Sequence, residues 1–346
     1  MTRLRSMLSL VSVFGLSGGA LAAVNDHYPF VVDTVHSRLM YEIDSNMGLC
    51  DLGLGAHGEV TGTMVLALYP GALPISSGQY AGGDCACTPD LVGIVPNSVP
   101  GLPHLLEVRL SNLVVQQHSP PFQCDSFGEY LADVGLDVTE GNLDVSVLGG
   151  PFVPVPIIGM TSDHARTQGQ LWIDDSGIHV IREFGNAFTV SVPALNLELY
   201  IGIRGVIRGQ MEFPVPTSFC PATPNSTGQP AQIGFAGTPS VSRNDGQLLV
   251  MSCPPSTMGV FVTSDEKGQV PFGNGTLCAT GRLLRLGTIQ VSATGSGASA
   301  LDLQAPPAAG NLVAGTHWVI QFAYRDVAAG GALFNASDAV AIDFVP

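Results

Sequence analysis

The chain has 346 residues, of which 12% are charged and 45% hydrophobic, and it carries a formal net charge of −15. Its 42 glycines and 25 prolines disfavour long helices and are typical of short strands joined by turns, while the apolar content excludes a disordered linker. A nucleic-acid partner is also excluded, because no basic cluster is present to displace counterions from phosphates. Binding to anionic membrane surfaces is disfavoured for the same reason.

The N-terminal segment has the three parts of a signal peptide. Arg3 and Arg5 form a basic region, residues 7–16 are apolar, and Ala20-Leu-Ala22 matches a cleavage site. The apolar run is too short to span a bilayer. We therefore expect residues 1–23 to be removed and the mature chain to be exported, either to the cell surface or to the extracellular space.

Residues 24–213 predict an N-terminal β domain, barrel-like or sandwich-like, because large apolar residues recur at every second position along most of it. The turn Asp174-Asp-Ser-Gly177 predicts a hairpin. One short helix is expected within residues 125–140, weakened by Gly128 and Gly135. Strands are expected at 30–44, 58–69, 105–115, 143–147, 170–173, 178–182, 189–192, 197–203 and 206–213.

Four of the seven cysteines lie in this domain, and in an exported chain they predict disulfide bonds. Cys85 and Cys87 are too close in an extended segment to bridge each other comfortably. We expect them to pair separately with Cys50 and Cys124. Residues 70–104, which are rich in proline and glycine, are then expected to form a disulfide-stapled loop.

The opening of this domain, Val32-Asp-Thr-Val-His-Ser-Arg38, places Asp33 before the pair His36 and Ser37. Over residues 30–44 it resembles the first strand of bacterial YceI-like barrels. The resemblance implies a lipocalin-like antiparallel barrel that holds a long apolar ligand, although the cysteine-rich segment departs from the family pattern. Such a ligand would need an elongated apolar cavity rather than a filled core, lined from residues 39–43, 60–68 and 197–211.

Prolines that begin at Pro214 resist both helix and central strand, so residues 214–218 are expected to link two domains. Residues 219–346 predict a compact C-terminal β-sandwich of short strands. Cys220 is expected to pair with Cys278, which leaves Cys253 as a free thiol. The expected strands are 231–237, 247–252, 259–263, 288–291, 300–303, 318–324 and 340–344.

Several motifs mark this second domain: Cys220-Pro-Ala-Thr-Pro-Asn-Ser-Thr-Gly228, Gly273-Asn-Gly-Thr-Leu-Cys278, Tyr324-Arg-Asp326 and Phe334-Asn335. Together they resemble a C-terminal module of exported proteins from planctomycete-type and similar marine bacteria. That family has no assigned activity. The resemblance therefore implies a recurrent extracellular module that is attached to varied partners, and it implies no reaction.

The chain ends in a predicted hairpin formed by residues 315–326 and 334–344, in which large apolar residues alternate. Polar residues near its turn are candidates for a binding site. The alternative, which we favour, is structural: Arg325 pairs with a carboxylate, and Asp338 or Ser337 accepts hydrogen bonds from backbone N–H groups. The candidate binding residues are Arg325, Asp326, Asn335 and Asp338.

Signals for a metal or for catalysis are weak. The eight histidines show no zinc-binding spacing, and no Gly-x-Ser-x-Gly elbow is present, so we expect no cofactor and no enzymatic activity. Trp172 and Trp318 lie on alternating strands and are expected in the core rather than as platforms for sugars. Ca²⁺ could find oxygen ligands, without EF-hand or β-roll spacing, in Asp302, Asn335, Ser337, Asp338 and Asp343.

The leading hypothesis is a non-catalytic exported protein whose C-terminal domain mediates attachment or assembly with an unknown cell-surface or extracellular component. The first alternative is a protein whose N-terminal domain binds an apolar, lipid-like small ligand. An exported hydrolase is the third. It would need a polar cleft that gathers His164 or His36 with carboxylates and a serine.

Overall fold

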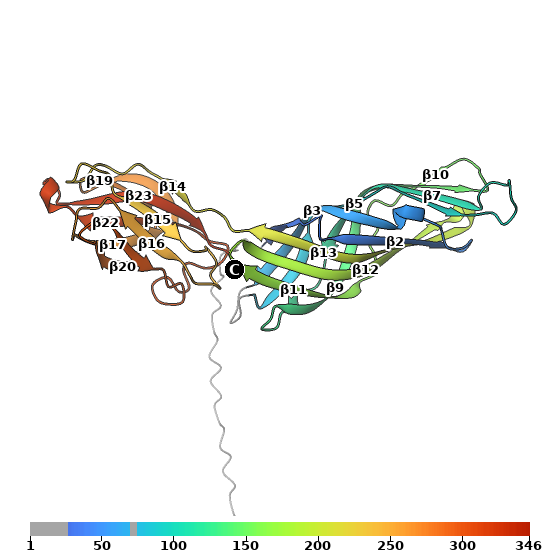
Figure 1. Ribbon diagram of the computed structural model, residues 1–346, viewed down its shortest axis with the longest axis horizontal. Coiled ribbons are helices and arrows are strands. Elements are labelled where there is room, and N and C mark those ends of the chain that lie inside the picture. Colours follow the sequence, from blue (N-terminus) through green and yellow to red (C-terminus); the bar gives the residue numbers. More distant parts are fainter. Residues whose placement is uncertain (1–26, 70–74) are drawn as a thin grey trace, which may run out of the picture.

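The computed structural model describes residues 27–69 and 75–346 (Figure 1). The expected signal peptide, residues 1–23, lies outside the described residues. Within them, 61% of residues are in strands and 3% are helical, which confirms the predicted all-β class. The helical residues form 3-10 turns, η1 (Gly53–Ala56), η2 (Pro193–Leu195) and η3 (Val327–Ala329). Figure 1 shows two lobes in series, which we name the N-lobe (27–213) and the C-lobe (214–346).

The N-lobe is built on a 13-stranded antiparallel sheet that closes on itself. Its strands pair along the path β9-β11-β12-β13-β1-β3-β5-β7, and β7 pairs with β9, which completes the ring. Closure encloses one face of the sheet and removes most unpaired edges. The strands are β1 (His27–Val32), β2 (Arg38–Ser45), β3 (His57–Tyr69), β4 (Ser77–Gly82), β5 (Cys85–Thr88), β6 (Leu91–Val95), β7 (Leu106–His118), β8 (Phe122–Gln123), β9 (Glu129–Val147), β10 (Val153–Val155), β11 (Ala165–Asp174), β12 (Gly177–Val192) and β13 (Leu197–Glu212).

The enclosed face of this sheet is filled with side chains. The inward residues of β2, β3 and β13 are buried and belong to one continuous hydrophobic cluster. They occupy the positions that would line an apolar ligand cavity, and they pack against one another instead. The arrangement does not favour a long apolar ligand. The residues are Leu39, Tyr41, Ile43, Val60, Met64, Leu66, Leu68, Leu199, Ile201, Ile203, Ile207 and Met211.

Several secondary-structure predictions for this lobe are wrong, whereas the hairpin at Asp174–Gly177 is confirmed as the turn between β11 and β12. The expected strand 30–44 is divided into β1 and β2 by a turn at residues 34–36. Most of the expected helix at 125–140 is the first half of β9, whose inward residues Tyr130, Ala132 and Val134 alternate with exposed ones. The expected loop at 70–104 contains three strands, β4, β5 and β6, in its described part. In both segments the period-2 pattern outweighs the glycines and prolines.

The C-lobe has a five-stranded sheet in the order β14-β23-β22-β17-β20, a three-stranded sheet β15-β16-β21 and a two-stranded hairpin β18-β19. Residues of the first two sheets share one hydrophobic cluster, as in a sandwich. The hairpin β18-β19 was not predicted from the sequence. The strands are β14 (Thr217–Phe219), β15 (Gln232–Ala236), β16 (Gln247–Met251), β17 (Met258–Ser264), β18 (Glu266–Phe272), β19 (Gly275–Thr280), β20 (Leu284–Gln290), β21 (Gly297–Ala300), β22 (His317–Arg325) and β23 (Phe334–Asp343).

The predicted terminal hairpin is confirmed as β22 and β23. Every residue of β22 except its two ends is buried, because the strand lies between β17 and β23 and is covered on both faces. Trp318 and Phe322 face the main C-lobe cluster. On the other face, Val319 contacts a small cluster that contains Cys220 and Cys278.

The end of the chain joins the two lobes. Val345, just beyond β23, is buried in the hydrophobic cluster of the N-lobe. Its carbonyl accepts a hydrogen bond from the N–H of Val241, and the Oγ of Ser240 donates to the carbonyl of Pro346. Beside this contact Arg243 of the C-lobe forms a 2.6 Å ion pair with Asp175 of the N-lobe. The terminal strand therefore contributes to both cores.

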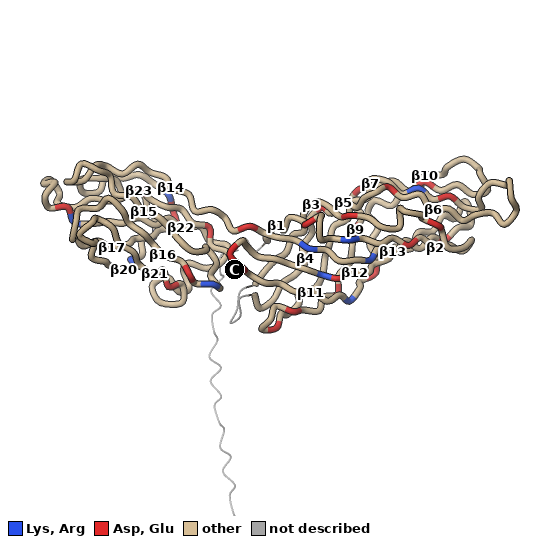
Figure 2. Tube along the Cα trace, in the orientation of Figure 1, with Lys and Arg blue, Asp and Glu red and all other residues tan. Residues whose placement is uncertain are grey.

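The charge is divided unevenly between the lobes, as Figure 2 illustrates. Residues 27–213 contain 20 Asp and Glu against 6 Arg, which is a formal charge of −14. Residues 214–346 contain 7 Asp and Glu against 5 Lys and Arg, which is −2. The N-lobe thus accounts for most of the acidity, and the C-lobe is close to neutral.

The Cys220–Cys278 disulfide is present as predicted, and Cys253 is free as predicted. The expected disulfides of Cys50, Cys85, Cys87 and Cys124 are absent, and all four are buried thiols. The expected stapled loop is not found among the described residues: the four side chains belong to strands and turns of the packed core, and their sulfur atoms are not bonded to one another. The thiol of Cys85, for example, accepts a hydrogen bond from Gln117 at 3.4 Å.

This difference can be tested by counting thiols. Burial raises the pKa of the Cys50, Cys85 and Cys124 thiols to about 11 and that of Cys87 and Cys253 to about 12. The folded chain is therefore expected to resist iodoacetamide at about pH 8, because the thiolate is the reactive form. After unfolding without reductant, mass spectrometry should find five alkylated cysteines. A single alkylated cysteine would support the original disulfide prediction and contradict the structure.

Candidate functional site

The candidate residues of the terminal hairpin are close in sequence but have different surroundings. Asp326 is buried, and its Oδ2 accepts a hydrogen bond from the N–H of Ser226 at 3.0 Å. Asn335 is fully buried, and its Oδ1 accepts hydrogen bonds from Thr223 Oγ1 at 3.0 Å and from the N–H of Ala336 at 2.8 Å. Both side chains hold the segment after Cys220 against the hairpin, which is a structural role.

Asp338 also binds backbone. Its Oδ1 accepts a hydrogen bond from the N–H of Ile233 at 2.7 Å, which ties β23 to β15 of the second sheet. Partial burial disfavours the carboxylate, and this effect outweighs the hydrogen bond from Ile233, so the pKa of Asp338 is raised. The acceptor role is the one favoured from the sequence, although the donor is 105 residues away rather than in the adjacent turn.

Arg325 differs from the other three. Its side chain is exposed at the end of β22, and no ion pair to it is found among the described residues, so the expected carboxylate partner is missing. It lines an open groove of about 430 Å³, which we name the C-lobe groove. The other lining residues are almost entirely apolar: Met258, Gly259, Val260, Phe272, Thr288, Ala323, Tyr324 and Phe334.

The groove was not foreseen apart from Arg325. Phe272 belongs to the unpredicted hairpin β18-β19, and its ring meets that of Phe334 edge to face, with the centroids 4.9 Å apart. Alternation from the core residue Val340 would bury Phe334. The register of β22 and β23 shifts between Gln321 and Ala323, however, and Phe334 is 36% exposed. No local sequence signal reports such a shift.

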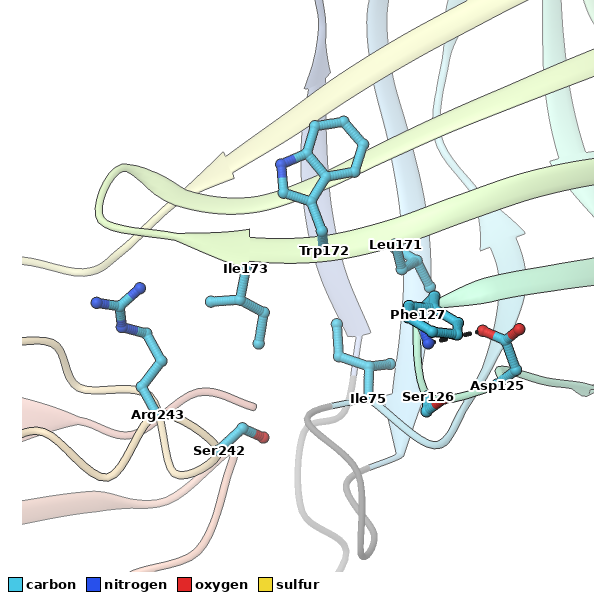
Figure 3. A pocket seen from close by; sticks show the side chains of 10 residues that line it. Ile75, Asp125, Ser126, Phe127, Leu171, Trp172, Ile173, Ser242 and Arg243 are labelled. Carbon is cyan, nitrogen blue, oxygen red and sulfur yellow. Dashed lines mark hydrogen bonds between the residues drawn. The ribbon is translucent and has the colours of Figure 1, made fainter.

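A second concave site lies between the lobes (Figure 3). It has a volume of about 200 Å³ and is lined by Phe127, Trp172 and Ile173 of the N-lobe and by Arg243 of the C-lobe. Trp172 is 37% exposed, so its predicted burial is wrong, whereas Trp318 is buried as predicted. The Trp172 ring is already stacked on the ring of His179. The guanidinium of Arg243 is likewise engaged, since it binds two carboxylates, Asp175 and Asp245.

His179 belongs to a Ser/His/Asp cluster at the β11–β12 turn. His179 stacks on Trp172 with a centroid separation of 4.9 Å, and its Nε2 lies 2.9 Å from Asp174 Oδ2 and 3.1 Å from Ser176 Oγ. In a catalytic triad the acid and the serine bind opposite ring nitrogens. Here they share Nε2, and the Ser176 hydroxyl donates to Asp174 at 2.7 Å. The cluster therefore stabilises the turn and holds the pKa of Asp174 well below its usual range.

The N-lobe motif and the expected Ca²⁺ ligands make separate structural contacts. Asp33 caps the turn between β1 and β2, with its Oδ2 2.6 Å from His36 Nδ1, and the buried Ser37 hydroxyl accepts a hydrogen bond from Arg208 N–H. Of the expected Ca²⁺ ligands, Asp343 pairs with His317 at 2.6 Å. Within the described part of the chain, no three His, Cys, Asp or Glu side chains form a metal-binding group.

A buried cation in the N-lobe has no acidic partner among the described residues. Arg182 is 1% exposed, and its Nη2 donates to Gln117 Oε1 at 2.6 Å. Its guanidinium lies 4.8 Å from the ring centroid of Tyr80 and 5.4 Å from that of Phe184. Cation–π contacts of this kind offset part of the desolvation cost of the charge.

Comparisons of the chain with family models, with curated proteins and with solved structures find no match. The resemblances at residues 30–44 and 219–346 therefore stay predictions. Among the described residues, no helix combines the length and the hydropathy needed to cross a membrane. The fold and the site define a class: an all-β protein of two lobes with an open apolar groove on the C-lobe.

The role of Asp338 gives a test based on pH. Because its pKa is raised in the folded chain, this carboxyl favours folding below its unfolded pKa, and that contribution is lost as the pH rises through the folded pKa. Asp338→Asn keeps the acceptor for Ile233 and never ionises. It is expected to be more stable than the wild type at about pH 7, with an advantage that shrinks toward about pH 4.

The measurement is chemical denaturation followed by Trp318 fluorescence in a Trp172→Phe background. Asp338→Ala is the matched variant, because it leaves the Ile233 N–H without its acceptor and is expected to lose about 1 kcal/mol. An advantage of Asp338→Asn that grows as the pH falls would contradict the assignment.

Proposed function

We propose that this chain is an exported, non-catalytic protein of the cell surface or extracellular space, and that its C-lobe attaches it to a partner protein. The observation that carries the proposal is the C-lobe groove, an open apolar surface with the unpaired Arg325 on its rim. Exposed apolar concavities of this kind are typical of interaction sites, because leaving them in water is unfavourable.

The uneven division of charge between the lobes supports attachment through the C-lobe rather than through the N-lobe. The C-lobe carries a formal charge of −2 and can approach another surface with little repulsion, whereas the N-lobe carries −14 and stays solvated. The expected partner segment presents an apolar side chain to the groove and a carboxylate to Arg325. Met258 suits such contacts, because its flexible side chain adapts to the shape of its neighbours.

Two further observations favour this function over its alternatives. The filled N-lobe core offers no support for an apolar ligand, and the shared Nε2 of His179 offers none for a hydrolase. The Cys220–Cys278 disulfide is compatible with an oxidising compartment, as export would require.

The test is retention on the producing cell. The full-length gene carrying Met258→Asp is expressed, and the protein in the cell-surface fraction is compared with that in the medium. Met258 is 48% exposed, so the change is tolerated by the fold, while a charge in the groove removes about 1.5–3 kcal/mol of apolar burial on binding. The surface-bound share is expected to fall about tenfold or more.

Met251→Asp is the matched control, because Met251 is 51% exposed on β16 of the same lobe and does not line the groove. It is expected to leave retention unchanged, while Arg325→Glu reduces it. Equal retention of the Met258 and Met251 variants would refute attachment through the groove.

A further inference from the structure

Two histidines that are 46 residues apart in the sequence meet on the outer surface of the N-lobe. His118 ends β7 and His164 immediately precedes β11, and their Nε2 atoms are 3.1 Å apart. The rings meet edge to face, with centroids 5.0 Å apart. The sequence does not indicate this pair, because the two histidines are far apart in the chain. The pairing of strands in the sheet brings them together.

The sheet explains how the pair forms. Strand β9 lies between β7 and β11, with His118 opposite Gly135 and Ala165 opposite Val134. A Cβ at position 135 would lie 2.4 Å from His118 Nε2 and 3.0 Å from His164 Cδ2. Glycine therefore leaves the space above β9 in which the two imidazoles meet. Position 135 is on the outer face of β9, and it is buried because the two rings cover it.

A carboxylate lies beside the other ring nitrogen of His118. Asp137, two residues after Gly135 on the same face of β9, places its Oδ2 3.0 Å from His118 Nδ1. The alignment is poor for a hydrogen bond, so the contact is mainly electrostatic. Asp137 is itself positioned by Thr161, whose hydroxyl donates to Oδ1 at 2.6 Å. Asp137 thus lies beside the ring nitrogen of His118 that faces away from His164, where metal-bound imidazoles commonly have an acidic neighbour.

The distance between the two Nε2 atoms suits a shared metal ion. With bonds of about 2.0–2.1 Å, two imidazole nitrogens on one ion are about 2.9 Å apart at a right angle and about 3.3 Å apart in a tetrahedron. The observed 3.1 Å lies between these values. We propose that His118 and His164 bind one divalent transition-metal ion through their Nε2 atoms, with Asp137 as the outer partner of His118.

The chemistry of the site selects the ion. Two imidazoles suit Zn²⁺ and Cu²⁺, with Cu²⁺ bound more tightly, and they do not suit Ca²⁺ or Mg²⁺. Asp133 and Asp163 add negative charge nearby, and Arg166, opposite Asp133, adds one positive charge. Because His164 is exposed, the remaining coordination positions are open to water or to a ligand from another molecule.

The test uses the untagged mature chain. Titration with CuCl₂ is followed by electron paramagnetic resonance, which detects nitrogen ligands, and titration with ZnCl₂ by calorimetry. One ion per chain with two imidazole nitrogens is expected. His118→Gln and His164→Gln should each weaken binding tenfold or more. Gly135→Ala should weaken it although both imidazoles remain, because the added methyl separates them.

The matched control is His317→Gln, since His317 also pairs with an acid, Asp343 at 2.6 Å, but has no second imidazole beside it in the described chain. It should leave the affinity unchanged, and Asp137→Asn should lower it about tenfold. Circular dichroism confirms that each variant is folded. Absence of binding, or equal affinity of the wild type and both His118 and His164 variants, would overturn the proposal. Neither result bears on the C-lobe groove, which lies on the other lobe.

Discussion

The structure depends on the burial of one strand, β22. Paired on both edges and covered on both faces, it brings the two hydrophobic clusters of the C-lobe together. The side chain of Gln321 in the middle of this strand is fully buried, and its amide is satisfied by backbone groups of Thr276, Cys278 and Ser337. Such a network favours one register for the strand, because any slip would leave the amide without partners.

The partner strand β23 extends this constraint to the rest of the molecule. Asn335 and Asp338 tie β23 to the segment after Cys220 and to β15, and Val345 carries the chain end into the N-lobe core. The polar residues at the turn are therefore committed to the fold, with one exception. Arg325 lies at the end of β22, on the rim of the C-lobe groove, which the hairpin helps to line. Function is thus expected at the edge of the hairpin rather than within it.

Much of the fold could be predicted from local pattern, and much of the site could not. Alternation identified β22, β23 and the Asp174–Gly177 hairpin, because each element buries residues at every second position. The same pattern was present in β9, but the glycines suggested a weak helix instead. Gly135 shows why a local interpretation fails there. It is needed for the space that two imidazoles occupy, and these come from the end of β7 and from the residue before β11. The disulfides predicted for the N-lobe were wrong as well. They were inferred from the oxidising compartment that an exported protein enters, and this inference does not show that Cys85 and Cys87 face a packed core.

The central claim is that apolar burial in the C-lobe groove, rather than the charge of the N-lobe, attaches this protein. The most direct measurement is its retention on the producing cell across a series of salts. Exposed charges are screened within about 8 Å at 0.15 M salt, whereas sulfate strengthens apolar burial. The account predicts retention that persists in high NaCl and increases in sulfate. Retention that falls steeply with salt would make the pairing of charges, rather than apolar burial, the main attraction and would contradict the account.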